Sequence, residues 1–247
     1  MPFAPEVEQL IKEVEDSTGI PVHVAEEPAM RLRASVTPAR RGSPAHWVRF
    51  KPGSGSLDYL VASQLVFLQR SLTPPPGDRW EIASTRTEQD LGIRAMGLEV
   101  FNDDFARNMV GQIITQTRTY PVGFRVDSWI RENLPGLIAQ QDAEIRSQLA
   151  ENQRALAPEI RGKFPKGIVD ANTSMNAAFA FFWAGRFSEP RFAIPFTALG
   201  CKDRAEKLLA VLDDVPQEPA GDRELVARWA DLLGLAGAFH FKPADDN

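Results

Sequence analysis

The sequence predicts a mixed α+β fold that is mostly helical, with a small N-terminal β-sheet packed on a buried helix and a larger helical body after it. Two observations support this fold class. Between residues 20 and 50, short runs rich in β-branched residues alternate apolar with polar side chains, which is typical of strands. From residue 88 onward, apolar residues recur at three- and four-residue steps, which is typical of helices.

Residues 57–70 are predicted as the buried helix around which the chain is organised. Leu60, Leu65 and Leu68 fall on one face of this segment and form a continuous apolar stripe. Ser56 stands at the N-cap position, where its hydroxyl can accept a hydrogen bond from the first turn. We therefore expect this helix to lie against the strands that precede it.

The other elements follow in chain order. A helix is predicted over residues 4–17, and strands are predicted over 20–24, 30–36 and 46–50. Residues 80–85 fit either a loop or a short strand. Helices are then predicted over 89–102, 104–118, 125–133, 136–156, 166–185, 195–212 and 222–233. A strand or a docked tail is predicted over 238–241.

The prolines support this division, because proline lacks the N–H that a helix interior needs. Pro121, for example, falls between two predicted helices. We expect an N-terminal α/β subdomain over residues 1–87 and a helical subdomain over residues 88–247.

The composition is that of a globular protein, since 43% of the residues are hydrophobic. The single cysteine, Cys201, excludes an internal disulfide and fits a reducing compartment. No apolar run approaches the roughly 18 residues that span a bilayer, and residues 1–20 carry acids where a signal peptide would be basic. We expect a cytoplasmic, bacterial-type protein that does not contact a membrane.

The charge is unevenly distributed along the chain. The net charge of −5 argues against non-specific nucleic-acid binding by the whole chain. Residues 28–57, however, hold six basic residues and no Asp or Glu. The arginines among them are Arg31, Arg33, Arg40, Arg41 and Arg49. This region is predicted to bind a phosphate backbone or an acidic partner; the alternative is a solvated strand face balanced by the acidic remainder.

The order of the predicted elements, a helix, three strands, a buried helix and further helices, is the order found in zincin-type metallopeptidases. There the buried helix carries His-Glu-x-x-His, whose histidines bind zinc while the glutamate activates water. Residues 58–70 resemble the active helix of the peptidase-MA or ImmA/IrrE-like group, in which a tyrosine and a small apolar pair precede this motif. Other short stretches are similar to bacterial zincin-like relatives of unassigned function, namely 121–130, 135–141, 174–178 and 229–235.

The chain departs from the motif at each catalytic position. Ser63 and Phe67 stand where the histidines would be, and Gln64 stands where the glutamate would be. Phenylalanine cannot bind zinc, and glutamine cannot accept a proton as a general base. The resemblance therefore implies a degenerate site with no metal and no other cofactor. It places Asp127 near the position from which an acidic third zinc ligand would come. The alternative is that Asp127 has a surface or capping role.

Other chemistries find less support in the sequence. His23, His46 and His240 are not spaced as metal ligands and are predicted to be structural. Cys201 is predicted to be an inert thiol. The aromatic run over residues 179–187 is predicted to be core rather than a ligand pocket.

These observations predict a catalytically inactive, zincin-like pseudo-metallopeptidase that acts as a protein-binding or regulatory component, with a protein partner encoded nearby. Two other classes stay open. One is a nucleic-acid-associated protein that uses the basic strand region. The other is a hydrolase with an unrecognised site, in which Ser63, Gln64 and Asp127 supply the polar groups. The loss of the catalytic residues favours a protein that is not an enzyme.

Overall fold

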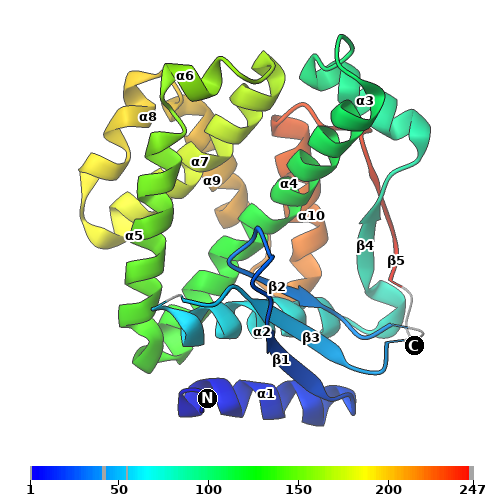
Figure 1. Cartoon of the computed structure of the whole chain (residues 1–247), viewed down its shortest axis with the longest axis vertical. Helices are drawn as coiled ribbons and strands as arrows, with labels where there is room; N and C mark the ends of the chain where they lie inside the picture. The colour runs from blue at the N-terminus through cyan, green and yellow to red at the C-terminus, as the bar shows by residue number, and fades with distance from the viewer. Residues whose placement is uncertain (1, 41–42, 54, 245–247) are drawn as a thin grey trace. The chain divides into compact units, whose positions relative to one another are not determined.

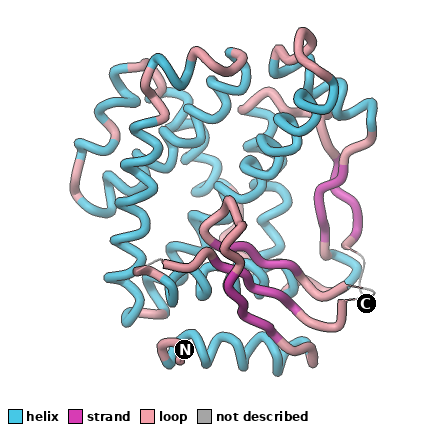
Figure 2. Tube along the Cα trace, in the orientation of Figure 1, coloured by secondary structure: helices cyan, strands magenta, loops and turns pink. Residues whose placement is uncertain are grey.

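A computed structural model describes residues 2–40, 43–53 and 55–244 of the chain. The predicted fold class is confirmed: the described residues form a mostly helical α+β structure with a small N-terminal three-stranded sheet and a second sheet of two strands (Figure 2). Within the described ranges, no helix combines the length and the apolar character that crossing a bilayer requires.

The chain divides into two compact units. Unit 1 contains the described residues up to 80 together with 123–146 and 243–244, and unit 2 contains 81–122 and 147–242. The predicted subdomains 1–87 and 88–247 stay a prediction.

Unit 1 is built on the N-terminal sheet and two helices. Its first elements are α1 (Pro5–Thr18), β1 (Val22–Glu26), β2 (Ala34–Thr37), β3 (His46–Phe50), α2 (Leu57–Leu72) and the 3₁₀ turn η1 (Pro76–Asp78). The sheet order is β1-β3-β2, with β1 parallel and β2 antiparallel to β3. Helix α2 packs against β2 and β3 on one face of the sheet, and α1 packs against α2 (Figure 1).

Side-chain alternation on β3 explains why α2 covers one face of this sheet. His46, Val48 and Phe50 are buried, whereas Trp47 and Arg49 between them are half-buried. Because successive side chains of a strand point to opposite faces, the first set faces α2 and the second faces away. Helix α2 contributes its apolar stripe to this core; Leu65 and Leu68, for example, are fully buried.

The ends of α2 differ from the prediction in one respect. Ser56 is the N-cap residue, but its side chain makes no capping hydrogen bond. Instead, the Asp58 carboxylate in the first turn accepts hydrogen bonds from the Ala4 N–H and the Gln140 side chain, both at 2.9 Å. The N-terminus of α2 is thus tied to other segments of unit 1.

Two long helices belong partly to each unit. Helix α4 (Asp103–Asn133) lies in unit 2 up to Val122, and α5 (Ile138–Arg154) lies in unit 1 up to Arg146. The turn η2 (Pro135–Leu137) connects them. Unit 2 also contains α3 (Arg86–Met96), α6 (Pro158–Arg161), α7 (Lys166–Phe187), η3 (Pro190–Phe192), α8 (Ile194–Ala198), α9 (Lys202–Asp214), η4 (Pro219–Gly221) and α10 (Asp222–Leu232).

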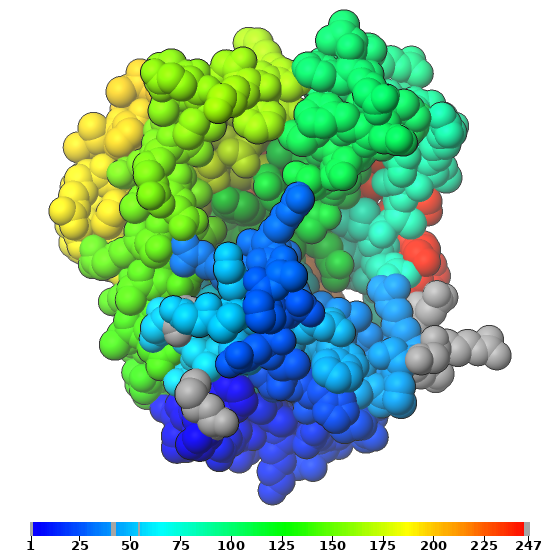
Figure 3. Space-filling view, viewed as in Figure 1, coloured from blue at the N-terminus to red at the C-terminus, as the bar shows by residue number. Residues whose placement is uncertain are grey.

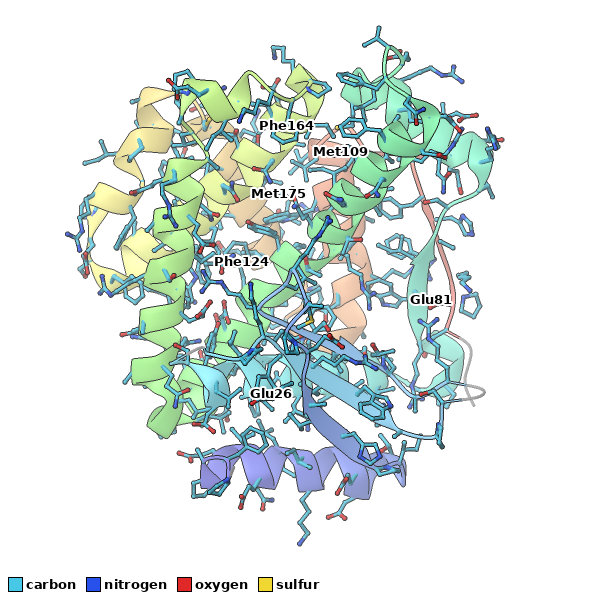
Figure 4. The ribbon with its side chains drawn as sticks, viewed as in Figure 1. Glu26, Glu81, Met109, Phe124, Phe164 and Met175 are labelled. Atoms are coloured by element: carbon cyan, nitrogen blue, oxygen red, sulfur yellow. The ribbon has the colours of Figure 1, made fainter. Side chains whose placement is uncertain are left out.

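The ambiguous segment at 80–85 and the final apolar piece form a two-stranded sheet. Strand β4 (Trp80–Ala83) pairs with β5 (His240–Pro243). Glu81 of β4, labelled in Figure 4, forms an ion pair with Lys242 of β5 at 2.6 Å.

The prediction of two helices over 104–118 and 125–133 was wrong, because α4 is continuous and contains Pro121. A proline inside a helix removes one N–H donor and crowds the preceding turn. The residues after it, Val122, Phe124 and Val126, are buried. Their burial offsets the lost hydrogen bond, so tertiary packing outweighs the local preference of proline.

The predicted helix over 195–212 is broken in two. It begins as α8, is interrupted at Gly200, and resumes as α9. Gly200 has φ of 72°, a left-handed conformation that glycine adopts at low cost and that ends a helix.

The core of unit 2 is centred on α7, which packs against α9. Met175 (Figure 4) and Trp183 of α7 are fully buried. Trp229 of α10 is also fully buried, and its indole N–H donates to the Leu208 carbonyl at 2.9 Å. In the aromatic run of α7, Phe179 and Trp183 are buried, whereas Phe181, Phe182 and Phe187 are half-buried, so the prediction that the run serves as core is confirmed in part.

The start of α7 lies directly against the end of α3. A Cβ added to Gly167 would lie 2.6 Å from the Met96 Cα and carbonyl oxygen, whereas one added to Gly185 of the same helix would meet nothing within 4 Å. We expect Gly167→Ala to lower the free energy of unfolding by about 1–3 kcal/mol, because backbone atoms must move. We expect Gly185→Ala to raise it by about 0.5–1 kcal/mol, because alanine favours a helix interior.

Urea denaturation of the two variants measures both changes. The close approach of α3 and α7 is contradicted if Gly167→Ala is as stable as Gly185→Ala.

Candidate functional site

The positions of the degenerate motif lie on α2 in unit 1. Tyr59, Ser63 and Phe67 follow one another at four-residue steps and so share a face of the helix. The Ser63 hydroxyl donates to the Leu60 carbonyl at 2.8 Å, and the Gln64 amide donates to the Ser63 hydroxyl at 3.4 Å. These polar groups thus make local hydrogen bonds along their own helix.

The side chains on this face do not fit a zinc ion. Zinc in proteins is bound by imidazole nitrogen, thiolate sulfur or carboxylate oxygen, and Ser63, Gln64 and Phe67 supply none of these. Within the part of the chain that the structure describes, no group of three or more His, Cys, Asp or Glu residues is arranged to hold a metal. No step of a zinc-dependent hydrolysis can be assigned to these residues.

Asp127 is buried inside unit 1 and accepts a hydrogen bond from Tyr59. The phenol of Tyr59 donates to the Asp127 Oδ1 at 2.7 Å, and the two residues are 6% and 8% exposed. The alternative that Asp127 is a surface acid was therefore wrong. The reason is that the last turns of α4 belong to unit 1, where α2 supplies a donor to the carboxylate.

The environment of Tyr59 keeps the phenol protonated. Burial raises the pKa of Tyr59 well above its usual value of 10, and the negative charges of Asp127 and Glu144 raise this pKa further. A phenolate beside these carboxylates would be a third buried negative charge. Tyr59 is therefore a permanent hydrogen-bond donor to Asp127, and the pair is poorly suited to proton transfer near neutral pH.

Helix α5 completes a polar network around this pair. Gln141 is fully buried and donates through its amide to the Asp127 backbone carbonyl at 2.8 Å. Glu144 is 7% exposed and forms an ion pair with Arg33. We call Tyr59, Asp127, Gln141, Glu144 and Arg33 the Tyr59 network; all five residues belong to unit 1.

Sequence reasoning missed the contribution of α5 to this network. Gln141 and Glu144 lie on the same face of α5 as the buried Ile145 and Leu149, at three- to five-residue steps. Polar residues at positions of the apolar face are a signal of buried hydrogen bonding. The largely polar composition of residues 142–154 indicates that one side of this helix faces water, but it does not reveal which polar residues lie on the buried side.

The predicted basic residues occupy different environments. Arg31 and Arg40 are exposed, Arg33 is engaged by Glu144, and Arg49 lies over the ring of Trp47 at 5.2 Å. Arg41 lies outside the described residues. The structure thus places Arg33 in the Tyr59 network and Arg49 on the outer face of the sheet.

His46 is a buried histidine with one hydrogen bond. It is 1% exposed, and its Nδ1 accepts from the Ala39 N–H at 2.9 Å. Nε2 therefore carries the proton of the neutral ring, and this atom has no hydrogen-bond partner among the described residues. Burial lowers the pKa of His46, because a charged ring would be desolvated and would also place a proton against the Ala39 N–H.

Comparison of the chain with protein-family models, with curated proteins and with solved structures finds no match. The resemblance to zincin-like peptidases therefore depends on the residues of α2 and on the order of the elements, and it stays a prediction.

The first prediction for the Tyr59 network concerns the phenol. We expect Tyr59→Phe to lower the free energy of unfolding by about 1–3 kcal/mol, because it removes a donor from a buried acidic acceptor. Tyr120→Phe is the matched control, since Tyr120 donates to the neutral amide oxygen of Asn176 at 2.6 Å. Its loss should be smaller, about 0.5–1.5 kcal/mol.

The alkaline limb of the stability profile provides a second readout for the same variant. The folded-state pKa of Tyr59 lies above the unfolded value near 10, so its contribution is present below pH 10 and is lost as the pH rises further. Urea denaturation between pH 8 and 11 should therefore show a smaller alkaline loss in Tyr59→Phe than in the wild type. Equal alkaline losses would contradict the buried phenol.

A separate prediction concerns His46. Because its folded-state pKa is lowered from 6.5, its neutral form stabilises the fold above that pH, and this contribution is lost as the pH falls. The free energy of unfolding should decrease by up to about 1.4 kcal/mol per pH unit below 6.5. Urea denaturation between pH 5 and 8 should show this decrease in the wild type and a flatter profile in His46→Gln.

The exposed His23 on the same sheet provides the control for His46. His23→Gln should keep the wild-type pH profile. A profile that His46→Gln leaves unchanged would show that another group causes the acid loss.

Proposed function

We propose that this chain is a catalytically inactive, zincin-like protein that acts by binding a partner protein. The predicted order of a helix, three strands and a buried helix motivates the comparison with zincins. The single observation that carries the proposal is the chemistry of α2, where the motif positions hold Ser63, Gln64 and Phe67.

The hydrogen bonding around α2 supports the loss of catalysis. In a zincin the acid near this helix would help to neutralise a cation, whereas here Asp127 is held by the neutral phenol of Tyr59. Glu144 has a counter-charge in Arg33. The buried acids therefore have partners within the protein and do not depend on an ion to stabilise them.

Partner binding is supported by an exposed apolar cluster in unit 2. Val100 is 89% exposed, and the rings of the exposed Phe101 and Phe105 lie 5.5 Å apart. Isolated apolar side chains are common on protein surfaces, but neighbouring aromatic ones are typical of surfaces that another protein covers. This cluster favours a macromolecular partner over a small substrate, and we propose that the partner is encoded nearby.

Metal analysis combined with a cleavage assay tests the loss of catalysis. We expect the purified protein to hold zinc well below one ion per chain and to leave casein intact, because α2 offers no zinc ligand. Stoichiometric zinc, or casein hydrolysis that a chelator abolishes, would contradict the proposal.

A variant with the motif restored is the control for this experiment. Ser63→His, Gln64→Glu and Phe67→His together place two imidazoles one turn apart on α2. The matched variant carries Lys202→His and Glu206→His at the same spacing on the exposed face of α9. If the scaffold is zincin-like, the restored helix binds zinc more tightly than the α9 pair and loses this advantage with Asp127→Asn.

A further inference from the structure

The outer face of the three-stranded sheet carries a row of stacked side chains. His23 of β1 lies opposite Trp47 of β3, and their ring centroids are 4.8 Å apart. On the same strand as Trp47, the guanidinium of Arg49 lies 5.2 Å from the centroid of the Trp47 ring. It also donates a hydrogen bond to the Thr37 hydroxyl at 3.3 Å. We call His23, Trp47, Arg49 and Thr37 the sheet-face ladder.

The sheet-face ladder is not part of the core of unit 1. Helix α2 packs on the opposite face, where His46, Val48 and Phe50 are buried. His23 and Thr37 are exposed, and Trp47 and Arg49 are half-buried. In Figure 1 the strands lie in front of α2, and in Figure 3 this N-terminal segment, in blue, faces the viewer. The ladder therefore presents aromatic and cationic groups to the solvent.

Basic residues and no acids accompany the ladder along β2, β3 and their connection, whereas Glu15 accepts a hydrogen bond from the Val22 N–H at the start of β1. Residues 28–57 contain no acid, and the exposed Arg40 lies in the β2–β3 connection, three residues beyond Thr37. Lys51 directly follows β3 at the other end, and its N–H donates to the Arg33 carbonyl. The nearest acid in the paired strands is Glu26 (Figure 4), which lies opposite Phe50 at the end of β1.

We propose that the sheet-face ladder binds single-stranded nucleic acid, with bases stacked on Trp47 and His23 and phosphates held by Arg49 and Arg40. Proteins that bind single strands combine a basic track with aromatic side chains on which unpaired bases stack. The four residue steps from Trp47 of β3 to Lys51, which follows the strand, extend over about 13 Å. This length accommodates two or three nucleotides.

The chemistry of the ladder favours a single strand over the other polyanions. Bases in a duplex are stacked on one another, so their faces cannot reach aromatic rings on a sheet. An acidic protein would satisfy the arginines but would leave the aromatic faces without a matching planar group. The ladder uses no residue of α2, so this inference is independent of the proposed loss of catalysis.

Fluorescence anisotropy with a labelled 15-nucleotide oligothymidine tests the inference on the full chain. We expect binding at 50 mM salt that weakens about 7-fold at 200 mM, since Arg49 and Arg40 neutralise about two phosphates. Trp47→Ala should weaken binding about 5- to 100-fold through the loss of stacking. Trp47→Phe, which keeps a ring, should restore part of the affinity. Arg49→Gln should weaken binding and also make it less dependent on salt.

Arg223→Gln is the matched control, because Arg223 lies over the Phe241 ring at the same distance of 5.2 Å but belongs to unit 2. It should bind as the wild type does. Circular dichroism of each variant shows whether weaker binding comes from loss of the site or from loss of the fold.

The inference would be overturned by no binding at 50 mM salt, by binding that a folded Trp47→Ala variant retains in full, or by equal binding of the matching duplex. A polyglutamate peptide that competes as strongly as the oligonucleotide would also overturn it and would assign the face to an acidic protein.

Discussion

The hydrogen bond between the Tyr59 phenol and the Asp127 carboxylate is the constraint on which unit 1 depends. A carboxylate that is 8% exposed is costly to bury unless donors surround it. Tyr59 supplies one donor from α2, and Gln141 of α5 binds the backbone carbonyl of the same residue. One acidic residue of α4 therefore connects α2, which is distant in sequence, with α5, which follows α4 directly. Any rotation of α2 that exposed Tyr59 to solvent would leave Asp127 without this partner.

The same constraint limits what the site can do chemically. A tyrosine beside two acids resists ionisation, so it cannot act as a base near neutral pH. The polar groups of α2 make hydrogen bonds along their own helix, and the buried acids have internal partners. A buried region of this kind contributes to stability and to the uniqueness of the fold. Under the proposed function, recognition falls to the surfaces, of which the outer sheet face and the Val100–Phe105 segment carry the most distinctive groups.

Local patterns predicted much of the fold because they report which side of an element is buried. The alternation of His46–Phe50 predicted β3 with its observed bounds, and the apolar stripe after Leu57 predicted α2. Pro121 and Gly200 show where local rules fail. At Pro121 the packing of the following residues keeps α4 continuous, whereas at Gly200 a single left-handed residue interrupts an otherwise helical pattern.

The candidate site was harder to predict than the fold, because its contacts join residues that are far apart in sequence. Tyr59 and Asp127 are separated by 68 positions, and Arg33 and Glu144 by 111. No periodicity relates such residues. The motif comparison named Asp127 but not its donor, because Tyr59, one turn before Ser63, is not one of the catalytic positions of the motif.

Unit 1 is assembled from separate stretches of the sequence, so its parts are synthesised at different times. The ribosome delivers the sheet and α2 first, while residues 123–146 follow only after about forty residues of unit 2 have been added. During that interval Asp127 and Glu144, the partners of Tyr59 and Arg33, have not yet been synthesised. Nascent chains of this type expose apolar surface that the completed fold buries, and chaperones bind such surface. Unit 1 therefore acquires its full set of interactions only after part of unit 2 has been synthesised.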